Sequence, residues 1–492
     1  MIALPDLAMA DTAPRTIGFF QRRAVRWSLL AAVFVWGAYQ SLWNLLSANP
    51  NADEPLYAIV GRQYVAGDAS QNHEQPPTAK YLFGVVQLIF GDGLAAPRIL
   101  VGVLTLLAGL IIFLWLRPEL GWVPALIPTA FWLLLPRGVD TTFEFRLDRV
   151  AVLEPVMAFF AIAAMAAAWQ WHRGRSVLWL VIAAISLGLS ATSKPTTAVI
   201  LPAFLLLIIA RRRLKPVVIG LLVSAATLGA TVFLVYRQIG LRTGITDLVN
   251  FQAAQNAGGH LIDLAGFATG HPPWWANLYF AWQGFGTITT VVLLAGTIAA
   301  FFAREHRLLV VYLTLALAPM MVFYLFIAKN ALPSYYYAWA WPLCILGGIG
   351  VARLLQPGWM AARTIVSRSF GSLLLALALV AAVSTSLLVW NDGPTGFARV
   401  DRALRAAGID HGMVLVSGVA PWEPEQAIGT RATTDPTAHC IVAVATKVSP
   451  RSPITPEVKA FIADHRSELH RTMLDNVTFY VFTRSAATAN CR

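Results

Sequence analysis

The stretch RRAVRWSLLAAVFVWGAYQSLWNLL, residues 22–46, decides the fold class. Three arginines, Arg22, Arg23 and Arg26, precede about twenty mostly apolar residues from Trp27 to Leu46. An apolar run of this length suits a membrane-spanning helix and exceeds the core of a cleavable signal peptide. Because basic residues favour the cytoplasmic side, we predict a retained first span with a cytoplasmic N-terminus.

The composition supports a membrane protein over a soluble one. Of the 492 residues, 57% are hydrophobic and only 13% are charged, and the mean hydropathy is +0.62. Soluble domains carry about 25% charged residues. The net charge of +12 could indicate a nucleic-acid partner. However, the arginines fall in short clusters between apolar runs, as orientation signals do. We therefore predict a polytopic membrane protein with membrane lipids, and no nucleic acid, as partners.

Eleven apolar runs predict about eleven transmembrane helices. The predicted spans are 27–47, 97–116, 122–136, 152–170, 177–193, 196–210, 216–236, 276–302, 308–328, 336–354 and 370–390. The run 76–90 is different, because it is short, begins with Pro76-Pro77 and contains Lys80. If it does not cross, every basic loop cluster falls on the cytoplasmic side; if it crosses, they all face out. We predict that 76–90 is a helix at the outer interface.

This topology divides the chain into two domains. Residues 1–390 form the membrane module, with outer loops 48–96, 137–151 and 237–275, and residues 391–492 form an external tail. Strand-like runs at 413–416, 440–445 and 477–482 alternate in the tail with a helical stretch near 456–470, which predicts a small α/β domain. Cys440 and Cys491 in the tail could form a disulfide in an oxidising compartment, and two free thiols are the alternative. Cys344 falls within a span, where we expect a packing role.

Ionisable residues gather at the predicted outer ends of the spans. Asp53 and Glu54 follow the first span, and they could act chemically or serve only as acids at a helix N-terminus. Glu154 lies among apolar residues, where a salt bridge or a functional role would offset the cost of burial. Arg98 and Lys194 fall at headgroup depth, where a cation can hold a lipid phosphate. Lys194 could also simply snorkel to the interface.

Aromatic and amide side chains mark two further outer segments. The loop 237–275 contains Gln252, Asn256 and His271-Pro272-Pro273-Trp274-Trp275, and Tyr335-Tyr336-Tyr337 precedes a late span. Such groups suit stacking and hydrogen bonding to sugar rings. Tryptophan and tyrosine also belong to the interfacial belt of any membrane protein, and this alternative stays open.

These motifs together resemble the GT-C glycosyltransferases. The closest pattern is that of the dolichyl-phosphate-mannose protein mannosyltransferases and the lipid A aminoarabinose transferase. The resemblance covers residues 27–355 and rests on the order of loose motifs along one membrane face. The matching segments are Asp53-Glu54 with Tyr57, His73-Glu74-Gln75-Pro76-Pro77, Leu88-Ile89-Phe90-Gly91 with Arg98, Arg149 with Glu154-Pro155, Gly188-Leu189-Ser190 with Ser193-Lys194, and Lys329-Asn330 through Tyr336 to Pro342. Here Glu154 stands where the family has Asp, and its spacing to the proline is one residue shorter.

The resemblance implies an inverting sugar transfer from a polyprenyl-phosphate donor to an acceptor lipid, glycan or protein. It implies Asp53 as the general base, with Glu54 as the second candidate. Arg98 and Lys194 would offset the charge of the leaving phosphate, and Glu54, Glu74 and Glu154 would orient hydroxyl groups. Arg149, His271 and Tyr336 complete the expected substrate-binding set. The site would face the periplasm or exterior of the inner (cell) membrane. No cofactor and no metal ligands are expected, although a divalent cation is possible because some relatives use one.

Two other classes of protein compete with this interpretation. A polytopic transporter or lipid-carrier flippase would place polar groups near the middle of the bilayer. Here the middles of the spans are almost free of charge, and the ionisable residues crowd one face. A scaffold that binds a partner through its tail would leave Asp53, Arg98, Glu154 and Lys194 unexplained.

Overall fold

The computed structural model describes most of the membrane module and short pieces of the tail. The described residues are 23–45, 53–138, 146–211, 214–260, 262–356, 364–391, 414–417, 432–433, 441–445, 454–464, 466–467, 469–474 and 477–482. Cys440 and Cys491 fall outside these ranges, so their pairing stays a prediction.

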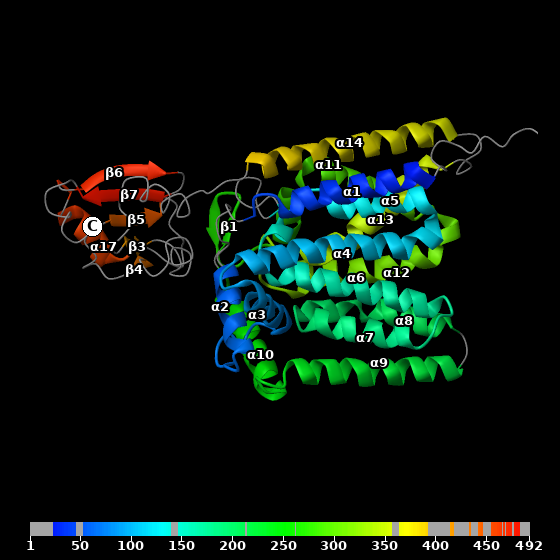
Figure 1. Ribbon diagram of the computed structural model, residues 1–492, viewed down its shortest axis with the longest axis horizontal. Helices are drawn as coiled ribbons and strands as arrows, with labels where there is room; N and C mark the ends of the chain where they lie inside the picture. The colour runs from blue at the N-terminus through cyan, green and yellow to red at the C-terminus, as the bar shows by residue number, and fades with distance from the viewer. Residues whose placement is uncertain are drawn as a thin grey trace, which may run out of the picture.

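Long helices that lie roughly parallel to one another form the body of the protein (Figure 1). Each predicted span coincides with one of them. They are α1 (Arg23–Leu42), α4 (Ala95–Leu120), α5 (Trp122–Leu134), α6 (Leu153–His172), α7 (Leu178–Ala191), α8 (Leu201–Ala210), α9 (Leu214–Val235), α11 (Ala276–Ala300), α12 (Arg307–Val322), α13 (Tyr337–Leu355) and α14 (Thr364–Asn391). The 3-10 turns η3 (Pro195–Ile200) and η4 (Arg304–His306) precede α8 and α12, and the π-helical turn η5 (Phe323–Ile327) follows α12.

Many of these helices have the length and composition of membrane spans. Among the described residues, seven helices are long and apolar enough to cross a membrane: α4, α6, α9, α11, α12 with its flanking turns, α13 and α14. Helices α5, α7 and η3–α8 are apolar but shorter. The chain is therefore a multi-pass membrane protein, and the number of eleven crossings stays a prediction.

Helix α13 forms the centre of the bundle. Its side chains Trp339, Trp341 and Cys344 are fully buried, the cysteine in the packing role that its sequence context predicts. A Cβ atom on Gly350 would lie 1.7 Å from the carbonyl oxygen of Gly296 in α11. The two helices therefore pack backbone to backbone, which small residues permit between membrane helices.

The segments predicted for the outer face gather at one end of the bundle (Figure 1). Helices α2 (Glu54–Val65) and α3 (Thr78–Phe90) lie there, together with α10 (Leu241–Gly258) and the hairpin of β1 (Ile262–Leu264) and β2 (Phe267–Thr269). Helix α3 covers the run 76–90 and packs against α2 and α4, and its position at the outer interface stays a prediction. The 3-10 turn η2 (Leu147–Arg149) belongs to the loop 137–151 and contacts α1 and α4.

The described pieces of the tail form one mixed sheet. Strands β3 (Val414–Ser417), β4 (Ala432–Thr433), β5 (Ile441–Ala445), β6 (Leu469–Leu474) and β7 (Val477–Phe482) lie in the order β4-β3-β5-β7-β6. Helix α17 (Pro456–Asp464) ends earlier than the predicted helical stretch, whose last residues belong to β6. Leu469 and His470 pair with Phe482 and Val481 of β7, so the last residues of the predicted helical stretch join the sheet. That the tail is a separate external domain stays a prediction.

Candidate active site

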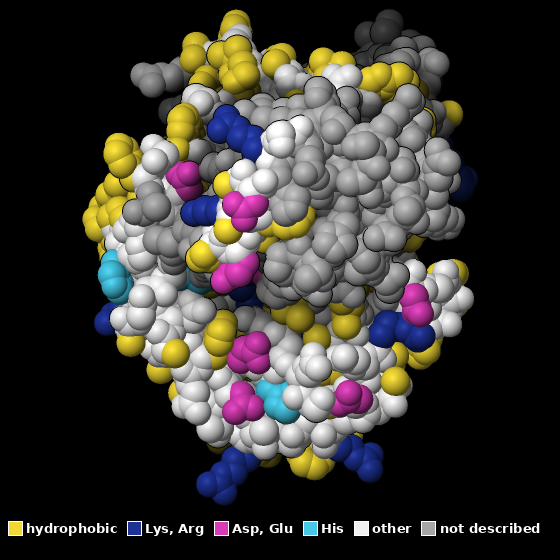
Figure 2. Space-filling model, turned by 90° about the vertical axis from the view of Figure 1, so that its left-hand side faces the viewer, with side chains coloured by type: hydrophobic (Ala, Val, Ile, Leu, Met, Phe, Trp, Pro, Cys, Tyr) yellow, Lys and Arg dark blue, Asp and Glu magenta, His cyan; other side chains and the backbone are white. Residues whose placement is uncertain are grey.

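The end of the bundle that carries α2 and α3 presents a mixed charged face. Figure 2 shows several Asp and Glu side chains on it, with Lys, Arg and His nearby. Three of the predicted carboxylates, Asp53, Glu74 and Glu154, converge on Tyr57 in the first turns of α2. The Tyr57 side chain is buried. Burial raises the pKa of this phenol well above its ordinary value, and Asp53, Glu154 and Glu74 raise it further. The phenol therefore keeps its proton at neutral pH and can donate a hydrogen bond.

Asp53 occupies the N-cap position of α2 and is exposed. Its side chain makes no capping hydrogen bond with the helix. A residue that served only as a cap would make such a bond, since capping consists of satisfying the first backbone N–H groups. The carboxylate is instead accessible from solvent beside Tyr57, where a general base for an external substrate would need to be.

Glu154 and Lys194 form the second half of the site. Glu154 lies in the first turn of α6, and Lys194 directly precedes η3. Glu154 Oε1 accepts hydrogen bonds from Lys194 Nζ at 2.7 Å and from Ser334 Oγ at 2.8 Å. Lys194 Nζ also lies 4.4 Å from the ring centroid of Tyr335. Glu154 therefore forms a salt bridge, the first of the two roles considered for it from the sequence, and this salt bridge lies within the cluster.

Tyr335, in the segment that precedes α13, forms one side of this cluster. Burial raises the pKa of Tyr335 to about 12; Lys194 opposes the shift, and Glu154 and Asp53 add to it. Because Lys194, Glu154 and Asp53 all act on this phenol, Tyr335 lies near both halves of the site. Its ring packs against that of Tyr324 at 5.0 Å, and the Tyr324 hydroxyl pairs with Thr196 Oγ1 at 2.8 Å. The Tyr335 ring therefore forms a wall beside the ammonium of Lys194.

Tyr335, and not the predicted Tyr336, lies at this site. Tyr336 is fully buried, and its hydroxyl donates to the Gly138 carbonyl oxygen at 2.6 Å. Its ring packs against Phe285 of α11. Consecutive residues at the start of a helix point in directions about 100° apart, so only one of the two tyrosines can face the cluster. Ser334 was not predicted at all, and a lone serine before the tyrosines gives no signal in the sequence.

Glu54 and Arg98 form a buried ion pair with each other. Arg98 Nε and Nη2 donate to the two carboxylate oxygens of Glu54, each at 2.7 Å. Glu54 Oε1 also accepts the Ala151 N–H at 2.7 Å, and Arg98 Nη1 donates to the Leu45 carbonyl oxygen. The exposed fractions of the two side chains are 0% and 2%. The pair therefore holds α2 against α4, a structural role that differs from the phosphate and hydroxyl contacts expected for these two residues.

Arg149 has a similar supporting position. Its guanidinium donates to the carbonyl oxygens of Gln40 at 2.9 Å and Trp43 at 2.8 Å, at the end of α1. The last carbonyls of a helix lack partners within the helix, and a cation there also matches the helix dipole. Arg149 therefore holds the end of α1, and this contact corrects its expected place in the substrate-binding set.

A buried ion cluster lies next to Arg149. Asp148 accepts hydrogen bonds from both Arg137 and Arg146, and all three side chains are buried. Burial opposes ionisation of Asp148, but Arg146 and Arg137 outweigh it and hold its pKa below the ordinary range. Ser41 of α1 donates to Asp148, and Arg146 donates to the Leu133 carbonyl oxygen of α5, so the cluster fixes the described part of the loop 137–151 against these helices. Asp140 and Glu144 of the same loop fall outside the described residues.

Glu74 and His271 occupy different surroundings. Glu74 is half-buried, receives a hydrogen bond from Asn72 Nδ2 at 2.7 Å, and lies near Tyr57. His271 is exposed after the β1–β2 hairpin, and its backbone N–H donates to Thr269 Oγ1. The structure thus brings Glu74 to the cluster and gives His271 no described contact with it. Within the described ranges, no group of three or more His, Cys, Asp or Glu side chains could hold a metal ion.

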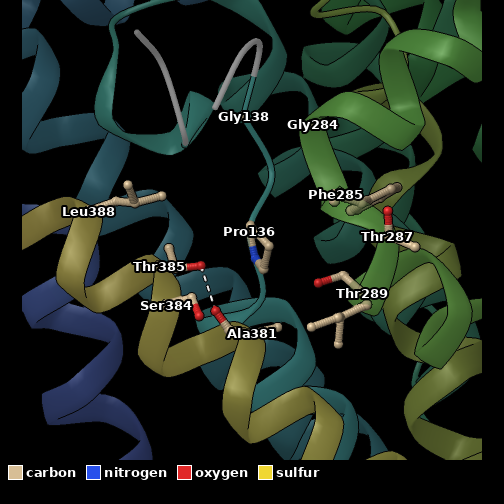
Figure 3. A pocket seen from close by; sticks show the side chains of 12 residues that line it. Pro136, Gly138, Gly284, Phe285, Thr287, Thr289, Ala381, Ser384, Thr385 and Leu388 are labelled. Atoms are coloured by element: carbon tan, nitrogen blue, oxygen red, sulfur yellow. Dashed lines mark hydrogen bonds between the residues drawn. The ribbon is translucent and has the colours of Figure 1, made fainter. Parts of the chain in front are cut away.

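A cavity lies deeper in the bundle, between α11 and α14 (Figure 3). Helix α11 is interrupted at Gly286, whose φ of 71° is unfavourable for other residues. The space beside this break measures about 190 Å³, and its wall is mainly apolar. Thr289, Ser384 and Thr385 contribute hydroxyl groups, and Figure 3 shows the Thr289 side chain directed into the space. Gly138, which lines this cavity, accepts the hydrogen bond of the Tyr336 hydroxyl at 2.6 Å.

The overall arrangement matches solved membrane glycosyltransferases. ArnT from Cupriavidus metallidurans, solved with undecaprenyl phosphate bound, matches with a TM-score of 0.60 over 94% of this chain and 98% of its own, at 14% identity. AglB from Archaeoglobus fulgidus, an oligosaccharyltransferase solved with an inhibitory peptide and a dolichol-phosphate, matches with a TM-score of 0.53 over 87% of this chain and 70% of its own, at 12% identity. The chain therefore has the GT-C fold.

Sequence comparisons point to particular relatives within this class. Residues 74–236 match the family model described as dolichyl-phosphate-mannose-protein mannosyltransferase. The undecaprenyl phosphate-alpha-4-amino-4-deoxy-L-arabinose arabinosyl transferase of Edwardsiella ictaluri (strain 93-146) is 28% identical over 212 residues, which cover 39% of this chain and 36% of that protein. The aligned part thus spans about a third of this relative. These findings confirm the resemblance to GT-C glycosyltransferases that use lipid-linked sugars.

Proposed function

We propose that the protein transfers a monosaccharide from a polyprenyl-phosphate carrier to a hydroxyl group of a lipid, glycan or protein acceptor. The reaction takes place at the outer face of the inner membrane and inverts the anomeric carbon. The observation that supports this most is the cluster at one end of the bundle. There the exposed Asp53 lies beside Tyr57, and Tyr57 and Tyr335 connect it to the paired Glu154 and Lys194. The names of the relatives, which include undecaprenyl and dolichol phosphates, support the same donor class.

In the proposed reaction, Asp53 removes the proton of the acceptor hydroxyl. The hydroxyl oxygen forms a bond to the anomeric carbon, while the bond from that carbon to the carrier phosphate breaks. The phosphate oxygen leaves with the electron pair. A hydroxyl group is a poor nucleophile without a base, and a positioned carboxylate contributes about 10²–10⁴-fold to the rate. Glu74 and Glu154 orient sugar or acceptor hydroxyls.

Lys194 is the cation that this site offers to the carrier phosphate. An ammonium has three donors, and the structure shows one of them bound to Glu154 Oε1. The side chain is 13% exposed, against 2% for Arg98. A charge-assisted hydrogen bond from Lys194 to the phosphate would bind the donor and would stabilise the charge that develops on the leaving oxygen.

Lys194→Met is expected to weaken binding of the polyprenyl-phosphate donor by about tenfold to a hundredfold, since a hydrogen bond to a charged group contributes about 1.5–3 kcal/mol. The measurement is the apparent affinity for donor in a purified transfer assay. Lys329→Met is the matched control, because this exposed lysine lies near Tyr335 in the sequence but makes no described contact with Glu154. Equal donor affinity in wild type and Lys194→Met would exclude this role.

The activity itself is tested with the purified protein in lipid nanodiscs. Mass spectrometry of the lipids that co-purify should identify a polyprenyl phosphate carrying a hexose or pentose. Incubation with such a donor and candidate acceptors should form a new glycosidic bond and release the carrier phosphate. A transporter or flippase would instead move the carrier between leaflets without forming any product, and that result would reject the proposal.

A further inference from the structure

Lys80 of α3 is a buried cation that the proposed reaction does not use. Its side chain is 0% exposed. Its Nζ atom lies within hydrogen-bond distance of four oxygen atoms: the Asn72 carbonyl at 2.5 Å, the Gln75 carbonyl at 2.8 Å, Asn72 Oδ1 at 3.1 Å and the Tyr64 hydroxyl at 3.1 Å. The ring of Tyr64 lies 4.8 Å from the same atom. Burying an ammonium is costly unless its donors are satisfied, and here three donors face four acceptors.

The contacts of Lys80 determine how the side chain of Asn72 is oriented. The amide oxygen of Asn72 faces the ammonium, so its amide nitrogen must point away. That nitrogen donates to Glu74 Oε1 at 2.7 Å. The backbone of Asn72 has a φ of 55°, a left-handed conformation that asparagine tolerates better than most residues. Lys80, Asn72 and Glu74 thus form a continuous hydrogen-bonded chain.

This chain ends at the candidate active site. Glu74 is close enough to Tyr57 to raise its pKa, as Asp53 and Glu154 do. The start of α3 is fixed to the end of α7 as well. The Thr78 N–H donates to the Thr192 carbonyl at 3.0 Å, and the two threonine hydroxyls lie 2.6 Å apart. Thr192 is two residues before Lys194, so α3 is anchored to both halves of the site.

We propose that Lys80 is a positioning residue, which orients the Glu74 carboxylate through the side chain of Asn72. This inference rests on the proposed transferase function. Without Lys80, the Asn72 amide could rotate, and the Glu74 carboxylate would lose its fixed hydrogen-bond donor. A displacement of about 1 Å at a reacting group can lower a rate by about a hundredfold.

The charge state of Lys80 gives this chain a dependence on pH. Burial lowers the pKa of Lys80 to about 7, and Glu74 opposes the shift. As the pH rises through neutrality, the ammonium becomes an amine with two donors, which cannot serve four acceptors. The other titratable groups that face this region are Glu74 and His73 of the loop, Tyr64 of α2, Tyr81 of α3 and Tyr236 directly after α9. His73 is bound to Asp247 of α10 at 3.2 Å. Burial raises the pKa values of Tyr64 and Tyr81, which therefore stay neutral in this range.

The test is a double-mutant cycle in the purified full-length protein, with Lys80→Met, Asn72→Gly and Glu74→Ala. Asn72→Gly keeps the left-handed backbone and the carbonyl contact but removes the amide that connects Lys80 to Glu74. Lys80→Met and Asn72→Gly are each expected to lower kcat by about tenfold to a hundredfold with donor affinity unchanged. In the Glu74→Ala background, either change should lower kcat by less than about threefold. Lys459→Met, an exposed lysine of α17, is the control.

Two readouts separate this proposal from the function on which it rests. Hydrogen exchange of residues 66–77 should be faster by about tenfold or more in Lys80→Met and unchanged in Glu74→Ala, whether or not the wild type transfers a sugar. The loss of kcat at pH above about 7 should disappear in Lys80→Met and persist in the His73→Asn variant. Full additivity of Lys80→Met and Glu74→Ala, or unchanged exchange in this loop, would overturn the proposal.

Discussion

Asp53→Asn is expected to reduce sugar transfer by about 10²–10⁴-fold, the usual contribution of a positioned general base. Asparagine keeps the size and most of the hydrogen bonding of aspartate, but it cannot accept the acceptor's proton at neutral pH. The carrier lipid should remain bound, because Lys194 is the proposed contact for its phosphate. The measurements are initial transfer rates and the amount of lipid that co-purifies with each variant.

The matched control is Asp68→Asn, in the same outer segment. Asp68 is exposed, and its carboxylate accepts the Ser70 N–H at 3.0 Å. It does not belong to the cluster of carboxylates around Tyr57. Its loss should leave the rate within about twofold, as is usual for surface substitutions. If Asp53 served only as the N-cap of α2, asparagine would cap nearly as well and most of the activity would remain. Turnover of Asp53→Asn within about tenfold of wild type would therefore defeat the assignment.

Arg98→Ala is expected to destabilise the protein by about 3–5 kcal/mol, because it leaves the buried carboxylate of Glu54 without its cation. The expected measurement is a lower thermal unfolding midpoint in detergent, with reduced yield of folded protein. A double variant, Glu54→Leu with Arg98→Met, should recover much of this loss, since apolar residues can replace a buried ion pair.

The control for this experiment is another arginine of the same region. Arg62 pairs with Asp92 at 2.5 Å, with side-chain exposed fractions of 35% and 70%. Such surface pairs contribute about 0–1 kcal/mol, so Arg62→Ala should barely change the unfolding midpoint. If Arg98→Ala unfolded at the wild-type temperature and lost only donor binding, Arg98 would be a phosphate ligand and our reassignment of it would be wrong.

The helices of the bundle could be predicted from the sequence because each contains an apolar run, long in most of them and shorter in α5, α7 and η3–α8. Apart from α3, the elements of the predicted outer loops, α10 and the hairpin, could not. Helix α10 buries only Gly244, and the β1–β2 hairpin is only a few residues long. The hairpin is stabilised by burial of Ile262 and Leu264 against Ala276 and Phe280 of α11, a contact that leaves no periodic signal in the sequence.

Four of the predicted site residues lie together at one end of the bundle, and that this end faces outward stays a prediction. Asp53, Glu74, Glu154 and Lys194 fall within one cluster, as their common place at the outer ends of the spans indicated. The sequence could not show that Arg98 reaches Glu54, which is 44 residues away. It also could not decide between Tyr335 and Tyr336, since that depends on where α13 begins. Lys80 was noted only as an obstacle to membrane crossing, because its oxygen partners appear only when α2 and the loop 66–77 fold around it.

The ion pairs also differ in when they can form during biosynthesis. Chains insert and fold from the N-terminus as they are synthesised. Glu54 can meet Arg98 as soon as α4 has been made, and Glu154 can meet Lys194 once α7 is complete. Ser334, which completes the contacts of Glu154, lies 180 residues further along the chain. A nascent chain that ends before Ser334 lacks both this hydroxyl and the Tyr335 ring beside Lys194, so the cluster is completed only late in synthesis.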